Sequence, residues 1–333
     1  MIRPTLPVRL VGKEGSIVRD HVLWAYRILL DREPESEAAI LEKLQAWKTV
    51  KELRADFFTS PEFRVINPDF AHTNESNIVI KEIDGTLRLF IDLSDHVIGL
   101  NIIRGRYEQS EIGFVREILK PGHTVLDIGA NIGFFAIVMA SLVGPTGRVY
   151  AFEPVDHNVD LLTRSIAENR FEDHVEVKRC VVGERSGSAK LLFMEGEHAL
   201  NSGGAYLFTG GMDVPEGHRI LDVEMVSLDD CALRRPIAMI KIDVEGAEHL
   251  ALLGAKHILD TDRPIVLSEL NPIMLERISR CSSCRFIGEM RASGYDCHIL
   301  EGGRLVRRIT DVSDSRIRSV VFLPKEIALR PAA

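Results

Sequence analysis

A glycine-containing turn after a short apolar run is the part of this chain most suited to chemistry. The run is Val125-Leu-Asp-Ile-Gly-Ala-Asn-Ile-Gly-Phe-Phe135, and it predicts a buried strand that turns sharply into a helix after Asp127. Gly129 and Gly133 allow the backbone to approach a ligand, and the N–H groups at a helix start favour negative ligand atoms. We therefore predict a cofactor site. In the plainer interpretation, the turn is a tight connection and Asp127 caps the helix.

Two cofactors compete for such a turn, and they differ in charge. A dinucleotide brings a pyrophosphate, whereas S-adenosylmethionine brings an ammonium, a carboxylate and a sulfonium. The dinucleotide fingerprint has glycine in the middle position of its turn, where this chain has Asn131. A carboxylate at Asp127 would repel a pyrophosphate and attract an amino group. These residues favour S-adenosylmethionine, and a nicotinamide-dependent oxidoreductase is the alternative.

A second acidic residue follows the next apolar run. The segment from Arg148 to Phe152 is typical of a strand, and Glu153 and Pro154 come directly after it. A Rossmann-like sheet places its ribose-binding carboxylate roughly 20 residues after the glycine turn, so we expect Glu153 to accept hydrogen bonds from both ribose hydroxyls. The segment centred on Val181 is expected to form a wall for the adenine.

Seven segments typical of strands alternate with helical stretches and predict a doubly wound α/β sheet. They are residues 124–128, 148–153, 175–180, 238–243, 264–270, 296–300 and 318–323. Ligands of such sheets bind outside the carboxyl ends of the strands. Because Asp127, Glu153, Asp243 and Glu269 all lie at such ends, we predict a site at that rim of the sheet.

Four blocks occur in order along the chain and together suggest a family. They are Val125 to Gly133, Ala151 to Pro154, Ser227-Leu-Asp-Asp230 and Ile240-Lys-Ile-Asp-Val-Glu-Gly-Ala-Glu248. Together they resemble the FkbM-type S-adenosylmethionine-dependent methyltransferases. The resemblance implies a Rossmann-like, seven-stranded class I methyltransferase sheet over residues 78–325. It also implies methyl transfer to the hydroxyl of a sugar or glycan, a glycolipid or a secondary metabolite. A non-catalytic scaffold that binds the same cofactor is a further alternative.

The same resemblance places Tyr107 and Glu108 near the cofactor. The other explanation of these two residues, an ordinary helix start in which the dipole favours acids, is equally consistent with the sequence.

Methyl transfer to an alcohol needs a base or a cation, because an alcohol of high pKa attacks poorly while it keeps its proton. Asp243 follows a buried-looking run, and Glu269 and Asn271 end the next strand. This arrangement resembles the cation-dependent O-methyltransferases and would bind Mg²⁺. Alternatively, Asp243 or His249 acts directly as a general base, and Glu245 completes the candidate catalytic set. The three metal candidates would also be consistent with helix caps at strand ends.

Residues 16–64 differ in character from the rest and predict three short helices in a separate small domain. The phrases Ala25 to Pro34 and Phe57 to Phe63 resemble a small helical domain of unknown function that is attached to bacterial glycan-related proteins. This resemblance implies self-association or a partner in glycan synthesis. Residues 65–77 are expected to form a linker, and Asp84-Gly85 predicts a β-hairpin before the main sheet.

Between the third and fourth predicted strands lies the long segment from Leu191 to Asp222, which has few periodic signals. Its length predicts a loop that covers the substrate. Asn201, which matches a polar position of the family, and His198 are candidate contacts for the methyl acceptor. A loop without a role in binding is the alternative.

The composition limits the class of protein. A net charge of -8 over 333 residues, with Lys and Arg scattered, argues against nucleic acid as a partner. No apolar run reaches the ~18–20 residues of a membrane span, and the N-terminal residues lack the apolar core of a secretory signal. The five cysteines have no framework-like spacing, which favours reduced thiols. We therefore expect a cytoplasmic enzyme without a transmembrane segment that acts on a small molecule or glycan.

Overall fold

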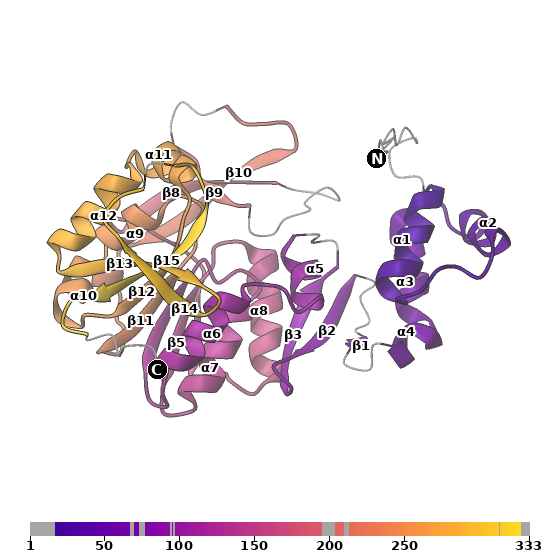
Figure 1. The fold of residues 1–333 in the computed structure, drawn as a ribbon, viewed down its shortest axis with the longest axis horizontal. Helices are drawn as coiled ribbons and strands as arrows, with labels where there is room; N and C mark the ends of the chain where they lie inside the picture. The colour runs from indigo at the N-terminus through magenta and orange to yellow at the C-terminus, as the bar shows by residue number, and fades with distance from the viewer. Residues whose placement is uncertain are drawn as a thin grey trace. The chain divides into compact units, whose positions relative to one another are not determined.

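The structure is a computed structural model that describes residues 17–66, 70–72, 77–93, 95, 97–194, 204–209, 213–312 and 314–327. Contacts divide the chain into two compact units, Met1–Lys81 and Glu82–Ala333. The boundary lies within strand β2 (Ile78–Ile83) (Figure 1).

The described residues of the first unit form four helices: α1 (Arg19–Leu29), α2 (Glu37–Ala46), α3 (Val50–Thr59) and α4 (Pro61–Ile66). Helix α1 packs against α2 and α3. The ring of Tyr26 meets that of Phe57 edge-on, with 4.8 Å between the centroids, at the centre of this small core. Ser36 and Thr49 accept backbone hydrogen bonds and cap α2 and α3. The sequence does not indicate the short helix α4, which begins at Pro61.

A hairpin precedes the main sheet of the chain. Strands β2 and β3 (Leu87–Asp92) flank a turn in which Asp84 and Gly85 both have positive φ, at 54° and 79°. This is the hairpin that the sequence predicts. A third strand, β1 (Phe70–His72), pairs antiparallel with β2.

The second unit is built on an eight-stranded mixed sheet with the order β14-β13-β15-β12-β11-β4-β5-β6. The strands are β4 (Thr124–Ile128), β5 (Arg148–Phe152), β6 (Val175–Lys178), β11 (Ile237–Ile242), β12 (Ile265–Leu270), β13 (Tyr295–Glu301), β14 (Arg304–Ile309) and β15 (Arg318–Pro324). Strands β6, β5, β4, β11 and β12 are parallel, and β15 is antiparallel to β12. The predicted seven strands are present, and β14 adds an eighth at the edge. Sequence order reverses between β4 and β11, which is where doubly wound sheets bind ligands.

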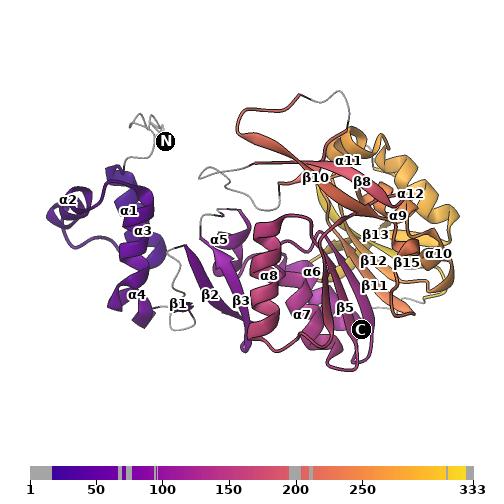
Figure 2. The same cartoon turned by 180° about the vertical axis from the view of Figure 1, so that it is seen from behind.

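Two groups of helices cover opposite faces of this sheet (Figures 1 and 2). One group is α6 (Gln109–Ile118), α7 (Phe134–Val143) and α8 (Asp156–Glu168), preceded by α5 (Ile98–Ile103). The other is α9 (Glu248–Leu253), α10 (Lys256–Thr261), α11 (Pro272–Ser279) and α12 (Ser283–Ala292). Helix α7 is apolar on nearly all sides because it packs against β4 and β5 as well as β3, α6 and α8. The packing of α7 holds in place the glycine-containing turn that precedes this helix.

Side chains of α8 seal the open edge of β3. The backbone N–H of Arg88 donates to Oδ1 of Asn169 at 2.9 Å, and Nδ2 of Asn169 donates to the Arg88 carbonyl at 2.6 Å. The N–H of Phe90 donates to Oγ of Ser165 at 3.0 Å. These bonds satisfy backbone groups that an edge strand would otherwise leave open.

A separate four-stranded sheet follows the third main strand. Its order is β7-β10-β8-β9, with β7 (Val181–Val182), β8 (Gly187–Met194), β9 (Tyr206–Leu207) and β10 (His218–Val226). A short 3₁₀ helix, η1 (Leu228–Asp230), leads back to the main sheet.

The expected covering loop, Leu191 to Asp222, is therefore partly strand. The sequence signal for β10 is the alternation of half-buried Leu221, Val223 and Met225 with mostly exposed neighbours. His198 and Asn201 lie outside the described residues, as do residues 67–69 and 73–76 of the predicted linker 65–77. Residues 70–72 of that linker form β1.

Within the described part of the chain, no helix is both long and apolar enough to cross a bilayer.

We expect Asn169→Ala to lower the free energy of unfolding by about 1–3 kcal/mol, because both backbone groups of Arg88 lose their partner. Asp160→Ala, in α8, removes an exposed pair with Arg164 and should change the free energy of unfolding by less than about 0.5 kcal/mol. Urea denaturation of the two variants measures the difference. Equal effects would show that Asn169 does not seal the strand edge.

Candidate functional site

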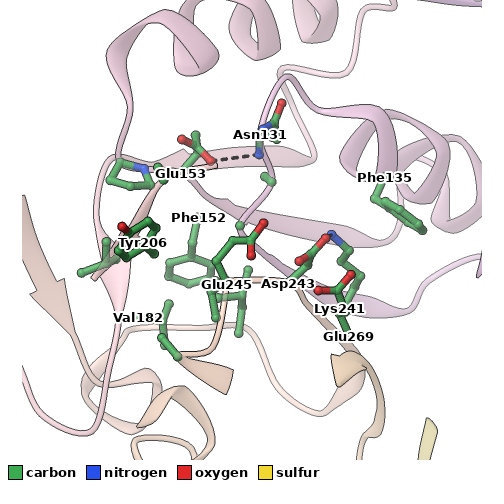
Figure 3. Close-up of a pocket in the computed structure, with 18 of the residues that line it drawn as sticks. Asn131, Phe135, Phe152, Glu153, Val182, Tyr206, Lys241, Asp243, Glu245 and Glu269 are labelled. Carbon is green, nitrogen blue, oxygen red and sulfur yellow. Dashed lines mark hydrogen bonds and ion pairs between the residues drawn. The ribbon is translucent and has the colours of Figure 1, made fainter. Parts of the chain in front are cut away.

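A cavity of about 230 Å³ opens at the carboxyl ends of β4, β5 and β11 (Figure 3). Ten of the residues predicted from the sequence lie on its wall: Tyr107, Glu108, Gly129, Asn131, Glu153, Pro154, Val181, Asp243, Glu245 and Glu269. Four others, Asp127, Gly133, His249 and Asn271, do not line it. In Figure 3, Glu153 and Asn131 lie together, and Lys241, Asp243 and Glu269 form a second polar group.

Glu153 is held rigidly at one end of the cavity. Its Oε2 accepts the backbone N–H of Asn131 at 2.9 Å, and its Oε1 accepts the N–H of Val155 at 3.0 Å and Nδ2 of Asn158 at 3.2 Å. Burial raises the pKa of Glu153 to about 7, and these donors oppose the rise. Since a carboxylate offers about four acceptor positions, it retains capacity for a ligand hydroxyl.

The glycines of the first turn serve the packing of the protein itself. Gly129 has φ of 78°, and a Cβ there would lie 2.0 Å from the carbonyl oxygen of Asp243. Gly133 has φ of 94°, and its Cβ would lie 2.4 Å from Cδ1 of Leu162 in α8. The first glycine therefore lets the ends of β4 and β11 meet, and the second lets α7 pack on α8. Gly129 also lines the cavity, so the approach of its backbone to a ligand stays a prediction, whereas Gly133 does not line it.

Asp127 lies behind the wall and is fully buried. Burial raises its pKa to about 6, while the nearby Lys241 opposes this rise. The sequence analysis expects Asp127 to attract the amino group of a ligand. In this geometry it contributes its charge from behind the wall, without lining the cavity.

Lys241 is a site residue that is not among those predicted from the sequence. It lies in β11, two residues before Asp243, so the alternation of a strand puts both on one face. Its Nζ is 3.5 Å from Oδ2 of Asp243 and 4.7 Å from the centre of the Phe135 ring. Burial acts to lower the pKa of Lys241, but the carboxylates of Asp243 and Glu108 outweigh it and raise the pKa. A lysine inside an otherwise apolar strand was the available signal.

Three further carboxyl groups on the wall are desolvated. Burial raises the pKa of Glu108 to about 7, against the opposing effect of Lys241. Burial and the charge of Asp243 raise the pKa of Glu245 to about 7 and that of Glu269 to about 8. With Asp243, four acids share this region with one ammonium. The surplus of negative charge favours a cationic ligand.

His249 points away from the cavity. It is buried between α9 and α12, with Nε2 2.6 Å from Oε2 of Glu289 and its ring edge-on to Phe286. Of the predicted catalytic residues, Asp243 and Glu245 remain on the wall.

The predicted magnesium ligands do not assemble. Oδ1 of Asn271 accepts the N–H of Met274 at 3.2 Å and caps α11, as in the helix-cap alternative. The ammonium of Lys241 lies against Asp243, where a cation would bind. Within the described residues, no three His, Cys, Asp or Glu side chains are grouped to hold a metal ion. The residues present therefore do not fit the predicted ion.

Glu248 shapes the loop that carries Asp243 and Glu245. Its Oε1 accepts the N–H groups of Val244 and Gly246 at 3.2 and 3.1 Å. The Glu248 side chain thus stabilises the loop through its backbone N–H groups. This accounts for the buried acid at the end of the sequence block from Ile240 to Glu248.

The remaining wall is apolar and comes from two sheets. Phe152, Val181 and Tyr206 of β9 line this part of the cavity. The ring of Tyr206 lies 5.3 Å from the guanidinium of Arg277. An apolar slot, a fixed carboxylate and an acidic end match the adenine, the ribose and the positively charged part of S-adenosylmethionine. The residues of the cavity thus fit this cofactor.

Comparison with known proteins agrees with this fit. Residues 127–297, just over half of the chain, match the family model of the methyltransferase FkbM domain. The chain is 30% identical over 170 residues to the 31-O-demethyl-FK506 methyltransferase FkbM of Streptomyces tacrolimicus, a match that covers 44% of this chain and 63% of that protein. It is 32% identical over 213 residues to the AMB antimetabolite synthetase AmbE of Pseudomonas aeruginosa, covering 50% of this chain and 10% of that protein.

A solved structure, the methyltransferase FkbM of Methylobacillus flagellatus KT, aligns with 90% of this chain and 58% of its own, at 15% identity and a TM-score of 0.41. The chain thus spans less than two thirds of each of these three proteins.

We expect Gly129→Ala to destabilise the fold by more than about 2 kcal/mol and to abolish cofactor binding, because the new Cβ meets the Asp243 backbone. Gly85→Ala is the matched control: its φ is 79°, but a Cβ there meets nothing within 4 Å, so about 1–2 kcal/mol is expected. Thermal denaturation and calorimetry with S-adenosylmethionine compare them. Similar losses in both variants would refute the close contact.

Cofactor affinity should rise by about tenfold between about pH 6 and pH 8.5, because a cation favours the ionised forms of acids whose pKa values lie near 7 to 8. S-adenosylhomocysteine carries the same amino-acid group without the sulfonium charge and should show a smaller rise. Calorimetry across this range measures both ligands. A flat or falling affinity for S-adenosylmethionine would contradict the acidic-cluster assignment.

Proposed function

This chain belongs to the FkbM family of S-adenosylmethionine-dependent methyltransferases, and from that premise we propose that it methylates a hydroxyl oxygen. The acceptor class we propose is a sugar or glycan, a glycolipid or a secondary metabolite. When bound, S-adenosylmethionine supplies a methyl group activated by its sulfonium. Family membership leaves no support for the nicotinamide oxidoreductase.

In this proposal, the chain holds the cofactor by three parts of the cavity. Glu153 accepts hydrogen bonds from ribose, and Val181 with Phe152 contacts the adenine. The acids near Lys241 surround the positive end. The wall positions of Tyr107 and Glu108 support a contact near the same end.

Glu245 on the cavity wall is the observation that supports oxygen methylation most directly. Its pKa of about 7, raised by burial and by Asp243, suits a general base near neutral pH. Asp243 is restrained by Lys241 and is well placed to orient the acceptor hydroxyl. Glu245 then takes the hydroxyl proton as the oxygen is methylated. The name of the Streptomyces relative, which refers to an O-demethylated compound, supports oxygen as the target.

A second, smaller cavity supports an acceptor rich in hydroxyls. It measures about 70 Å³ and shares Glu108, Lys241, Asp243 and Glu269 with the larger one. Glu111, Ser268 and Ser319 complete its polar lining. Carboxylates and hydroxyls of this kind accept and donate the hydrogen bonds that a polyhydroxylated group offers.

We propose the organisation expected from the sequence for the whole chain: a helical domain at residues 16–64, a linker at 65–77 and a methyltransferase domain at 78–325. The helical domain would serve self-association or a partner in glycan synthesis. The odd number of cysteines supports a cytoplasmic location. Mass spectrometry of glycans and metabolites from cells with and without the protein tests the acceptor class, through a mass difference of one CH₂.

We expect Glu245→Gln to lower kcat by about 10²–10⁴-fold, because the amide cannot take the acceptor proton, while the affinity for S-adenosylmethionine changes only a few-fold. Glu276→Gln, at an exposed position of α11, is the control and should leave both unchanged. Single-turnover assays and calorimetry measure the two quantities. Wild-type turnover by Glu245→Gln would remove Glu245 from the base role.

A further inference from the structure

Lys241 occupies an unusual place for a lysine. Its side chain is 7% exposed, yet it lies on the walls of both the larger and the smaller cavity. Its neighbours in β11, Ile240 and Ile242, are fully buried on the other face of the strand. The ammonium therefore reaches the region where the two cavities meet.

The charges around Lys241 explain why burial is tolerated. Nζ lies 3.5 Å from Oδ2 of Asp243, and Glu108 and Asp127 are the next charges that stabilise the ammonium. The face of the Phe135 ring, 4.7 Å away, adds a cation–π contact. A buried cation is retained when it is paired in this way, and its removal would leave several desolvated carboxylates without a counter-charge.

The same region is where the sequence predicts a divalent ion. Of the three expected ligands, Asp243 and Glu269 share the wall with Lys241, while Asn271 is engaged as a helix cap. A cation at this point would fix Asp243 and stabilise negative charge on an acceptor oxygen. An ammonium supplies both effects, although with one charge instead of two.

We propose that Lys241 is a positioning residue that takes the place of a divalent cation, holding Asp243 toward the acceptor so that methyl transfer needs no added metal. This role rests on the proposed hydroxyl methylation. Its electrostatic part, the substitution of a metal by an ammonium, is testable without any acceptor.

The acceptor-free test is Mn²⁺ binding measured by electron paramagnetic resonance. Lys241→Ala leaves Asp243, Glu108 and Glu269 without their ammonium, so we expect it to bind one Mn²⁺ at millimolar concentration. The wild type and Lys241→Arg, which keep a positive charge, should bind none in the cavity. Mn²⁺ that binds the wild type and is lost in Asp243→Asn would overturn the proposal, as would Lys241→Ala that binds no more than the wild type.

Turnover gives the second test. Lys241→Met should lower kcat by on the order of 10²-fold, as for the loss of one preorganised charge, without weakening cofactor binding when affinity is compared at about pH 8.5, where the acids on the wall are ionised. Methylammonium should restore part of the activity of Lys241→Ala, whereas tetramethylammonium, which cannot donate a hydrogen bond, should not. Weaker cofactor binding in Lys241→Met would indicate a merely structural role and refute the proposal.

Lys178→Met is the matched control. Lys178 lies in β6, pairs with Glu176 at 2.8 Å and faces the Tyr150 ring at 5.6 Å, but it does not line the cavity. It should keep wild-type kcat. If the wild type methylates no hydroxyl, the proposed function fails while the Mn²⁺ result still decides the role of Lys241. Wild-type activity that EDTA abolishes and Mg²⁺ restores would overturn the inference alone.

Discussion

The burial of several carboxylates around one ammonium is the constraint on which this structure depends. Burial disfavours the ionised forms of these acids, and repulsion from Asp243 adds to this, so the pKa values of Glu108, Glu245 and Glu269 are raised. A positively charged ligand in the cavity would offset part of this cost. The scaffold can sustain this because Asp243 and Glu269 lie at the ends of the central strands β11 and β12, and these strands are fixed by pairing in the sheet. Binding of such a ligand would thus also lower the electrostatic cost of the buried acids.

Much of this arrangement follows from the sequence. Strand-end positions are predictable because apolar runs end in acids, and parallel strands bring their carboxyl ends together, which places Glu153, Asp243 and Glu269 on one wall. The direction of a side chain beyond the strand end is not encoded so simply. Asn271 turns back to cap a helix, and His249 faces Glu289, because local hydrogen bonds decide both. The four-stranded sheet is not predicted, because the alternation of apolar and polar residues along its strands is weak and many of its side chains are half-exposed.

The turn motif shows a related limit. Its glycines identify the motif, but their physical reason lies in contacts between segments distant in sequence. Gly129 is required by the backbone of Asp243, more than 100 residues later, and Gly133 by Leu162. Such requirements appear only once the strands are adjacent. Lys241 differs from these glycines, because a lysine within an otherwise apolar strand indicates from the sequence alone a role other than packing.

Helix α8 connects two features that lie at its opposite ends. Asn158 in its first turns holds Glu153, and Ser165 and Asn169 near its end hold the edge of β3. A helix of 13 residues is a rod about 20 Å long and resists bending. One rigid helix thus contacts both β3 of the hairpin and Glu153, the carboxylate assigned to ribose. A substitution that shifts α8 is therefore expected to affect both the edge of β3 and the position of Glu153.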